Sequence, residues 1–195
     1  MVNRGADPSG RQPPGGAPSP DDHPLVAAFN DLRDELISTL VYLLGNRDDA
    51  LDAAQEAFLK CWRARETLPG ILNLRAWIFR VGMNTARDHQ RSAWSRRVKP
   101  LVGEELMLAA RDDAPNLALE DQEALDRLRK AICELRQEEK EVFLLRQNGN
   151  LTYEQIAEIR QAPVGTVKTQ MRSALIKLRK VLNPHEPSET GSSPT

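Results

Sequence analysis

The sequence predicts an all-α protein of two small helical domains joined by a flexible acidic linker, with a helix-turn-helix at the end of the second domain. Apolar residues recur at intervals of three and four over most of residues 24–100 and 123–182, which is the period of amphipathic helices. Between these stretches, residues 101–122 are acidic and show little periodicity, as is typical of a linker. A chain of 195 residues with 40% apolar residues is sufficient for two small cores.

Both ends of the chain are predicted to be disordered. Residues 1–23 are rich in Pro, Gly, Ser and Asp, and residues 183–195 have a similar composition. Such segments bury too little apolar surface to offset the entropy that they would lose on ordering. The polar N-terminus does not resemble a signal peptide, and no apolar run approaches the ~18 residues of a membrane helix. We therefore expect no membrane insertion.

Three helices are expected in the first domain. Gly45 provides a C-cap signal for the first of them, and Asp48 or Asp49 begins the second. A loop that contains Pro69 and Gly70 separates the second helix from the third. The three expected helices cover about 25–43, 48–65 and 74–94.

The third expected helix carries a polar face that suits nucleic acid. Arg80, Asn84, Arg87 and Arg91 follow one another at helical intervals, and Trp77 lies at the edge of their stripe. Guanidinium groups can hold phosphates, while an amide or an indole can hydrogen-bond or stack with an unpaired base. The alternative is a solvated arginine face beside a core tryptophan.

The second domain is expected to close with a helix-turn-helix. Thr152 and Gln155 form a Thr-x-x-Gln capping box, and Pro163 ends the short helix that follows them. A longer helix then starts near Val164 and carries five Lys or Arg but no acid. Its apolar stripe consists of Val167, Met171, Ala174, Leu178 and Leu182. A basic second helix suits the DNA major groove, although an ordinary helical hairpin with a solvated basic face is the alternative.

Positive charge is concentrated in two regions, although the net charge of the chain is −1. Seven Lys or Arg and one acid lie between Arg75 and Lys99, and the basic helix near the C-terminus forms the second region. Eight acids and one Arg separate them, between Gly103 and Asp126. Fully stretched, residues 101–122 would reach about 70 Å at ~3.3 Å per residue, which is roughly two turns of DNA. Two basic domains on this linker could therefore bind separate elements of one duplex.

Five segments, in this order, resemble the extracytoplasmic-function (ECF) class of bacterial RNA polymerase sigma factors in the sigma-70 superfamily. They are DAAQEAFLKCW (52–62), WIFRVGMNTARDHQR (77–91), EEKEVFLLR (138–146), LTYEQIAEI (151–159) and VGTVKTQMRSALIKLR (164–179). The resemblance implies a promoter-specificity subunit that binds core RNA polymerase, recognises the −10 and −35 promoter elements and promotes DNA melting. It also implies a first domain of the sigma region 2 type and a second domain of the region 4 type.

The resemblance implies a role for each matching residue. Contacts with core polymerase are implied for Asp52, Gln55 and Glu56. Contacts with the −10 element are implied for Trp77, Arg80, Asn84, Arg87 and Arg91, with Asn84 at the position that contacts a flipped base and the loop 67–73 enclosing that base. Contacts with the −35 element are implied for Lys168, Thr169, Arg172 and Ser173. Gln170 replaces a residue that is usually Arg in this family.

The same resemblance implies core RNA polymerase, promoter DNA and an anti-sigma factor as partners, in the bacterial cytoplasm. We expect no catalytic residues, no cofactor and no metal. Cys61 and Cys133 lie within apolar helical patterns and form no CxxC motif, so we expect buried, reduced thiols rather than a zinc site.

Two other function classes remain open from the residues. A stand-alone helix-turn-helix regulator of the GerE-like type would use the first domain for sensing or dimerisation, and would have no use for a polymerase-binding patch at 52–62. An enzyme is the other class, but His23, His89 and His185 are scattered along the chain and no carboxylates form a recognisable catalytic pair.

Overall fold

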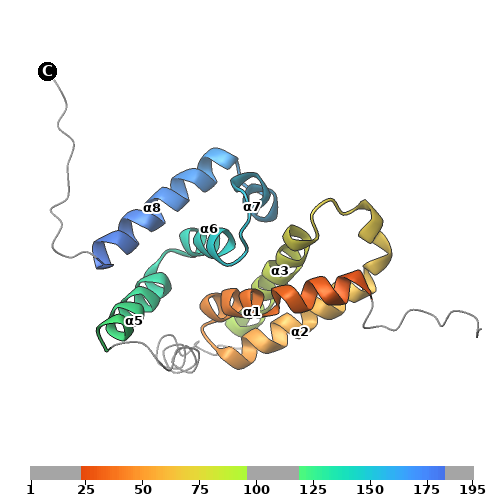
Figure 1. Cartoon of the computed structure of the whole chain (residues 1–195), viewed down its shortest axis with the longest axis horizontal. Coiled ribbons are helices and arrows are strands. Elements are labelled where there is room, and N and C mark those ends of the chain that lie inside the picture. The colour runs from red at the N-terminus through yellow and green to blue at the C-terminus, as the bar shows by residue number, and fades with distance from the viewer. Residues whose placement is uncertain (1–22, 96–118, 183–195) are drawn as a thin grey trace, which may run out of the picture.

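The computed structural model describes residues 23–95 and 119–182, and every regular element within these two ranges is a helix (Figure 1). The all-α fold class with two helical domains is therefore confirmed. The predictions for residues 1–22, 183–195 and most of the expected linker, from 96 to 118, lie outside the described residues. Nowhere in the described ranges is a helix long and apolar enough to cross a membrane.

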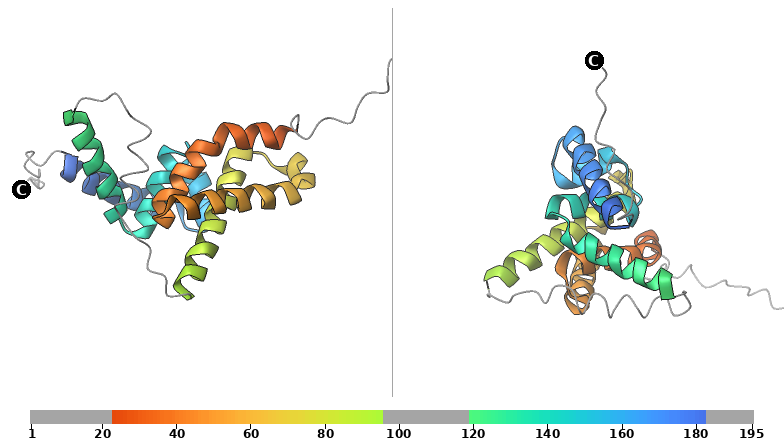
Figure 2. Two further views of the ribbon diagram at one scale, coloured as in Figure 1. Left: turned by 90° about the horizontal axis from the view of Figure 1, so that it is seen from below. Right: turned by 90° about the vertical axis from the view of Figure 1, so that its left-hand side faces the viewer.

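Within residues 23–95, the first domain consists of three α-helices and a short 3₁₀ helix. They are α1 (Pro24–Leu44), α2 (Arg47–Arg63), the 3₁₀ helix η2 (Arg65–Gly70) and α3 (Leu74–Ser95). Gly45 ends α1 in the left-handed conformation at φ 76°, as the C-cap signal predicts. Asn46 caps α2 by accepting a hydrogen bond from the amide of Asp49, so this helix begins slightly earlier than expected. The C-terminal half of α3 extends beyond α1 and α2 (Figure 2).

His23 corrects the predicted boundary of the disordered extension. Its Nδ1 accepts a hydrogen bond from the amide of Leu25 over 3.2 Å and thereby caps α1. Its ring also packs edge-on against Trp62, with 5.2 Å between the ring centroids. Composition alone could not show this cap, because the capping residue lies at the end of a Pro- and Asp-rich segment.

In the described range 119–182, the second domain contains four α-helices. They are α5 (Leu119–Glu134), α6 (Gln137–Gln147), α7 (Tyr153–Arg160) and α8 (Val164–Leu182). The first of these begins inside the segment 101–122 that the sequence predicts as a linker, because acidic residues at a helix N-terminus are compatible with helix formation. The capping box predicted for Thr152 and Gln155 is present at the start of α7.

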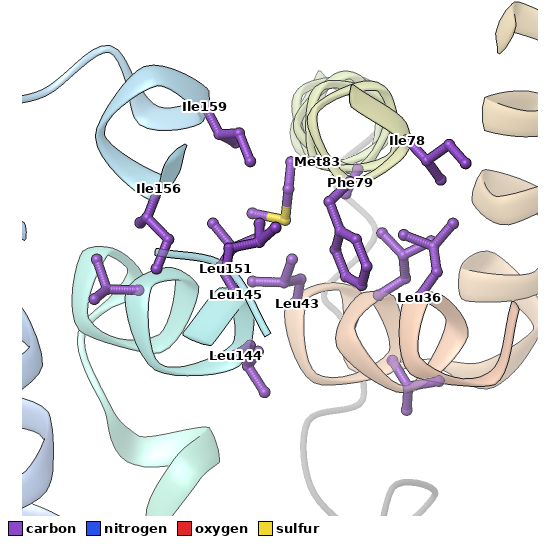
Figure 3. Packing of buried hydrophobic residues seen from close by; sticks show 14 of the residues in the cluster. Leu36, Leu43, Ile78, Phe79, Met83, Leu144, Leu145, Leu151, Ile156 and Ile159 are labelled. Carbon is purple, nitrogen blue, oxygen red and sulfur yellow. The ribbon is translucent and has the colours of Figure 1, made fainter. Parts of the chain in front are cut away.

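A single cluster of buried apolar residues runs through both domains. Met83 on α3 lies beside Leu145 and Leu151 of the second domain, and Ile159 on α7 faces the same side chain (Figure 3). All four residues are at most 4% exposed. The sequence predicts two separate domains on a tether, but each has apolar side chains that its own helices do not cover. Burying such a side chain contributes about 1.5–3 kcal/mol, which favours the packing of one domain on the other.

Candidate nucleic-acid interface

The helix α8 presents its basic side away from the core. Val167, Met171, Ala174 and Leu178 are buried as the apolar stripe predicts, whereas Leu182 is 40% exposed, so the stripe ends one turn earlier than expected. The preceding turn places Gln161 in the left-handed conformation at φ 52°. This turn and the α7 capping box fix the direction in which α8 leaves α7.

Three of the four residues predicted for the −35 element are exposed on α8. Lys168 Nζ lies over the Tyr153 ring, 5.9 Å from its centroid, which is a cation–π contact. The Thr169 hydroxyl donates a hydrogen bond to the Gly165 carbonyl over 2.9 Å, and this holds the side chain against its own helix. Arg172 is exposed, and none of the described residues pairs with it. Such an arginine can form a bidentate hydrogen bond with a guanine edge.

Ser173 is not grouped with these three residues. Its hydroxyl donates a hydrogen bond to Glu139 Oε1 on α6 over 2.7 Å, and Lys177 Nζ contacts both oxygens of the same carboxylate at 2.8 and 2.6 Å. Burial opposes ionisation of this carboxylate, but the hydrogen bonds from Lys177 and Ser173 hold the pKa of Glu139 below its ordinary value. The structure therefore places Ser173 in the contact between α6 and α8.

The polar face predicted on α3 forms, but its residues differ in what they contact. Arg80 is exposed, with no partner in the described part of the chain. Arg91 is 78% exposed and pairs with Asp88, one turn away. Hydrogen bonding from Arg91 accordingly keeps the pKa of Asp88 below its ordinary value. Trp77 is half-buried and packs against the core, so only part of its indole surface is accessible.

A chain of hydrogen bonds connects this face of α3 with the helix α8. Arg87 Nη1 donates to Asn84 Oδ1 over 3.1 Å, and Arg87 Nη2 pairs with Glu141 Oε2 over 2.9 Å. Arg160 Nε donates to the same Glu141 oxygen over 2.9 Å, and its Nη1 donates to the amide oxygen of Gln170. The residue predicted to capture a base is thus connected, through two ion pairs, to the helix predicted to read the −35 element.

Sequence reasoning missed Glu141 and Arg160. Glu141 occupies the buried side of α6, three and four positions before Leu144 and Leu145, and its side chain is only 5% exposed. The sequence does contain one signal for such a residue, namely a carboxylate within an apolar stripe, because a buried charge requires a partner. The sequence could not identify that partner, since Arg87 and Arg160 lie 54 and 19 positions away.

The patch predicted to bind polymerase lies on α2. Asp52 and Gln55 are exposed, whereas Glu56 accepts hydrogen bonds from two residues. Its Oε2 lies 2.8 Å from His89 Nε2 and its Oε1 lies 2.9 Å from Lys60 Nζ. These hydrogen bonds, from His89 first and Lys60 second, hold the pKa of Glu56 below its ordinary value. The carboxylate is 45% exposed and still able to meet a partner.

Next to this patch lies a groove of about 390 Å³ between α1 and α2. Phe29, Ile37 and Phe58 provide its apolar surface, and Arg33 and Gln55 lie among its polar lining residues. Gln55 therefore belongs both to the predicted polymerase patch and to the groove. A macromolecule that binds this side of the first domain would meet an apolar depression bordered by polar groups.

The segment 67–73, which is predicted to enclose a base, contains the end of the helix η2 and the three residues after it. Leu72 is fully exposed there, and Leu68, Pro69 and Ile71 line a depression of about 380 Å³ together with His23 and Arg65. Arg65 stacks its guanidinium over Trp62 at 5.0 Å and donates to the Trp62 carbonyl over 3.0 Å. The lining is apolar, which suits the stacking of a base more than the reading of its edge.

Comparison with known proteins agrees with the order of these surfaces along the chain. Sigma-70 region 2 matches residues 28–96, and sigma-70 region 4 matches residues 125–178, which together make up more than half of the chain. The chain is 28% identical over 157 residues to the RNA polymerase sigma-H factor of Pseudomonas aeruginosa, covering 77% of this chain and 81% of that protein. It is 29% identical over 143 residues to the ECF RNA polymerase sigma-E factor of Escherichia coli, covering 69% and 74%.

Two solved structures share the fold. The sigma factor RpoE of Bartonella quintana, in complex with the anti-sigma factor NepR, superposes with a TM-score of 0.60 at 20% identity over 82% of this chain and 97% of that one. CnrH, in complex with the cytosolic domain of CnrY, gives a TM-score of 0.58 at 20% identity over 83% and 89%. Both superpositions extend over the two helical domains of the present chain.

Proposed function

Because the chain belongs to the ECF sigma factors of the sigma-70 family, we propose that it directs core RNA polymerase to promoters that carry its own −10 and −35 elements. The observation that carries this proposal is the pairing of two exposed cationic surfaces, on α3 and α8, with a separate acidic and polar patch on α2. A protein that only binds DNA has no need for the third surface.

The second domain would hold the duplex. Lys168, Thr169 and Arg172 lie together on the exposed side of α8, where a recognition helix meets the major groove. Arg172 would read a guanine edge and the Thr169 methyl group a thymine methyl, while Lys168 would contact a phosphate. Ser173 would act through Glu139, by fixing the position of α8 on α6, rather than by touching a base.

The first domain would hold the strand that has separated. Arg80 and Arg91 would contact phosphates, and Asn84 would hydrogen-bond an unpaired base. Each base that is stacked or enclosed contributes about 1–3 kcal/mol. Capture of a few bases would therefore drive melting without nucleotide hydrolysis, so we assign the protein no enzymatic activity of its own.

Asp52, Gln55 and Glu56 would contact core polymerase, and their acidic and polar character complements a basic partner. An anti-sigma factor is a second protein partner that we propose, because the RpoE structure described above is a complex with one. Polymerase transcribes in the bacterial cytoplasm, and we place the protein there.

Binding to promoter DNA distinguishes this function from that of a stand-alone regulator. We expect the purified chain to bind a library of promoter duplexes weakly on its own and to select a subset of them once core polymerase is added. Tight, selective binding of the same duplexes without polymerase would support the regulator instead. The variant Asp52→Ala with Glu56→Ala should reduce polymerase binding, whereas Asp34→Ala on the exposed part of α1 provides a matched control.

A further inference from the structure

Five polar side chains form a continuous network between α2 and α3. On α2, Lys60 Nζ lies 2.9 Å from Glu56 Oε1. The same ammonium group reaches α3, where it donates to Thr85 Oγ1 over 3.1 Å and to Asp88 Oδ2 over 3.5 Å. His89, also on α3, places its Nε2 2.8 Å from Glu56 Oε2. Each oxygen of the Glu56 carboxylate therefore has its own nitrogen partner, one from each helix.

Lys60 is held in place independently of Glu56. Thr85 is fully buried, and its hydroxyl donates to the Val81 carbonyl over 2.9 Å, so the lone pairs of the hydroxyl oxygen are left for Lys60. Asp88 provides a second acceptor on α3. An isolated ion pair on a surface contributes little, because two long side chains must be immobilised to form it. Here α3 already immobilises one of the two, so the pair with Glu56 loses less entropy.

The Glu56 carboxylate is fixed but remains accessible. Its side chain is 45% exposed, and an ionised carboxylate offers about four lone-pair sites, of which the two nitrogen partners use two. A cationic group of another protein can therefore bind without displacing either partner. Ordering a free side chain at an interface reduces affinity, and a carboxylate that is already ordered avoids this loss. By contrast, Asp52 has no partner among the described residues, so it has to be ordered when a partner binds.

We propose that His89 and Lys60 are positioning residues, which hold the carboxylate of Glu56 in the orientation that core polymerase binds. The inference rests on the proposed function, because it takes Glu56 as a polymerase contact. It adds a residue of α3 to the determinants of polymerase binding, although His89 itself would not touch polymerase. An ionised carboxylate only accepts hydrogen bonds, so His89 must donate through Nε2. The side-chain amide of glutamine can donate in the same way.

Fluorescence titration with core polymerase tests this role, at a temperature where circular dichroism shows every variant to be folded. His89→Ala should weaken binding about 2- to 10-fold, the effect of leaving one long side chain to be ordered on binding. His89→Gln should restore most of the affinity, because it returns a donor to Glu56. In a Glu56→Ala background, His89→Ala should have no further effect, since the group that it positions is absent.

A second pair of variants separates positioning from a general role in holding α2 against α3. Asp52 lies one turn before Glu56 on α2, so a displaced α2 would move both carboxylates. If His89 acts through Glu56 alone, Asp52→Ala should weaken polymerase binding by the same factor in the parent chain and in His89→Ala. A smaller effect of Asp52→Ala in the His89→Ala variant would show a displaced helix and overturn the positioning role.

Three other results would also overturn the positioning role. They are an unchanged affinity of His89→Ala, no recovery in His89→Gln, and a further loss when His89→Ala is added to Glu56→Ala. Each of them can occur while the parent chain binds core polymerase normally, so the proposed function would stand. Failure of the parent chain to bind core polymerase at all would overturn the proposed function and the positioning role together.

Discussion

Arg160 on α7 forms a buried ion pair with Glu141 on α6, and their side chains are 10% and 5% exposed. The same guanidinium donates to the amide oxygen of Gln170 on α8, so one side chain joins three helices of the second domain. The family resemblance of the sequence implies an arginine where this chain has Gln170. Here the cation at this junction comes from α7 instead, and Gln170 accepts a hydrogen bond from it.

This arrangement predicts that Arg160 stabilises the second domain. Arg160→Leu should lower the free energy of unfolding by about 3 kcal/mol, the low end for a buried pair, because Arg87 still contacts Glu141. Adding Gln170→Arg to this variant should recover part of the loss by returning a cation to the junction. Urea unfolding measures both effects, with Arg179→Leu on the exposed side of α8 as control. A stable Arg160→Leu variant would contradict the assigned role.

The local elements of this domain could be predicted from the sequence, whereas its junction could not. The α7 capping box, the turn at Pro163 and most of the α8 stripe depend on residues a few positions apart, and all are present. Glu141 and its two arginines are far apart in the chain, so nothing in the local pattern pairs them. Ser173 could not be placed correctly from the sequence for the same reason. Its spacing suits the exposed face of α8, but its hydroxyl donates a hydrogen bond to Glu139 on α6.

Acid should destabilise the contact between α6 and α8. Hydrogen bonds from Lys177 and Ser173 hold the folded-state pKa of Glu139 below its ordinary value of 4.5. A depressed pKa means that this stabilisation is complete above about pH 4.5 and is lost as the pH falls through the folded-state pKa. Unfolding at pH 7 and at steps below pH 4.5 should show a shallower acid slope for Glu139→Gln than for the parent chain. The exposed Glu138→Gln is the control, and equal slopes for Glu139→Gln and the parent would refute the assignment.

Arg172 is predicted to read a base of the −35 element. Its side chain is exposed, with no partner in the described residues, so it is available to a guanine edge. Arg172→Ala should weaken promoter binding by about 1–3 kcal/mol and relax selectivity at one position of that element. Competition among −35 variants in the presence of core polymerase measures this. Unchanged selectivity would exclude a base contact, and Lys180→Ala, further along the exposed side of α8, controls for loss of charge.

Asn84 is predicted to act after polymerase has bound. It lies on α3 and bonds with Arg87 of the same helix, whereas Asp52, Gln55 and Glu56 lie on α2. Asn84→Ala should therefore leave the affinity for core polymerase unchanged and reduce the amount of open complex, because one captured base contributes about 1–3 kcal/mol. Permanganate reactivity of unpaired thymines reports the open complex, and fluorescence titration reports polymerase binding. Equal losses in the two assays would count against base capture by this residue.

In the proposed function, three surfaces of one chain cooperate to start transcription: the patch on α2, the polar face of α3 and the basic side of α8. Run-off transcription from a promoter library, with core polymerase in the presence and absence of the protein, measures this directly. We expect discrete transcripts from a subset of promoters only when the protein is present, and we expect their loss when Arg172→Ala and Asn84→Ala are combined. Absence of protein-dependent transcripts from every promoter in the library, with an active core polymerase, would contradict it.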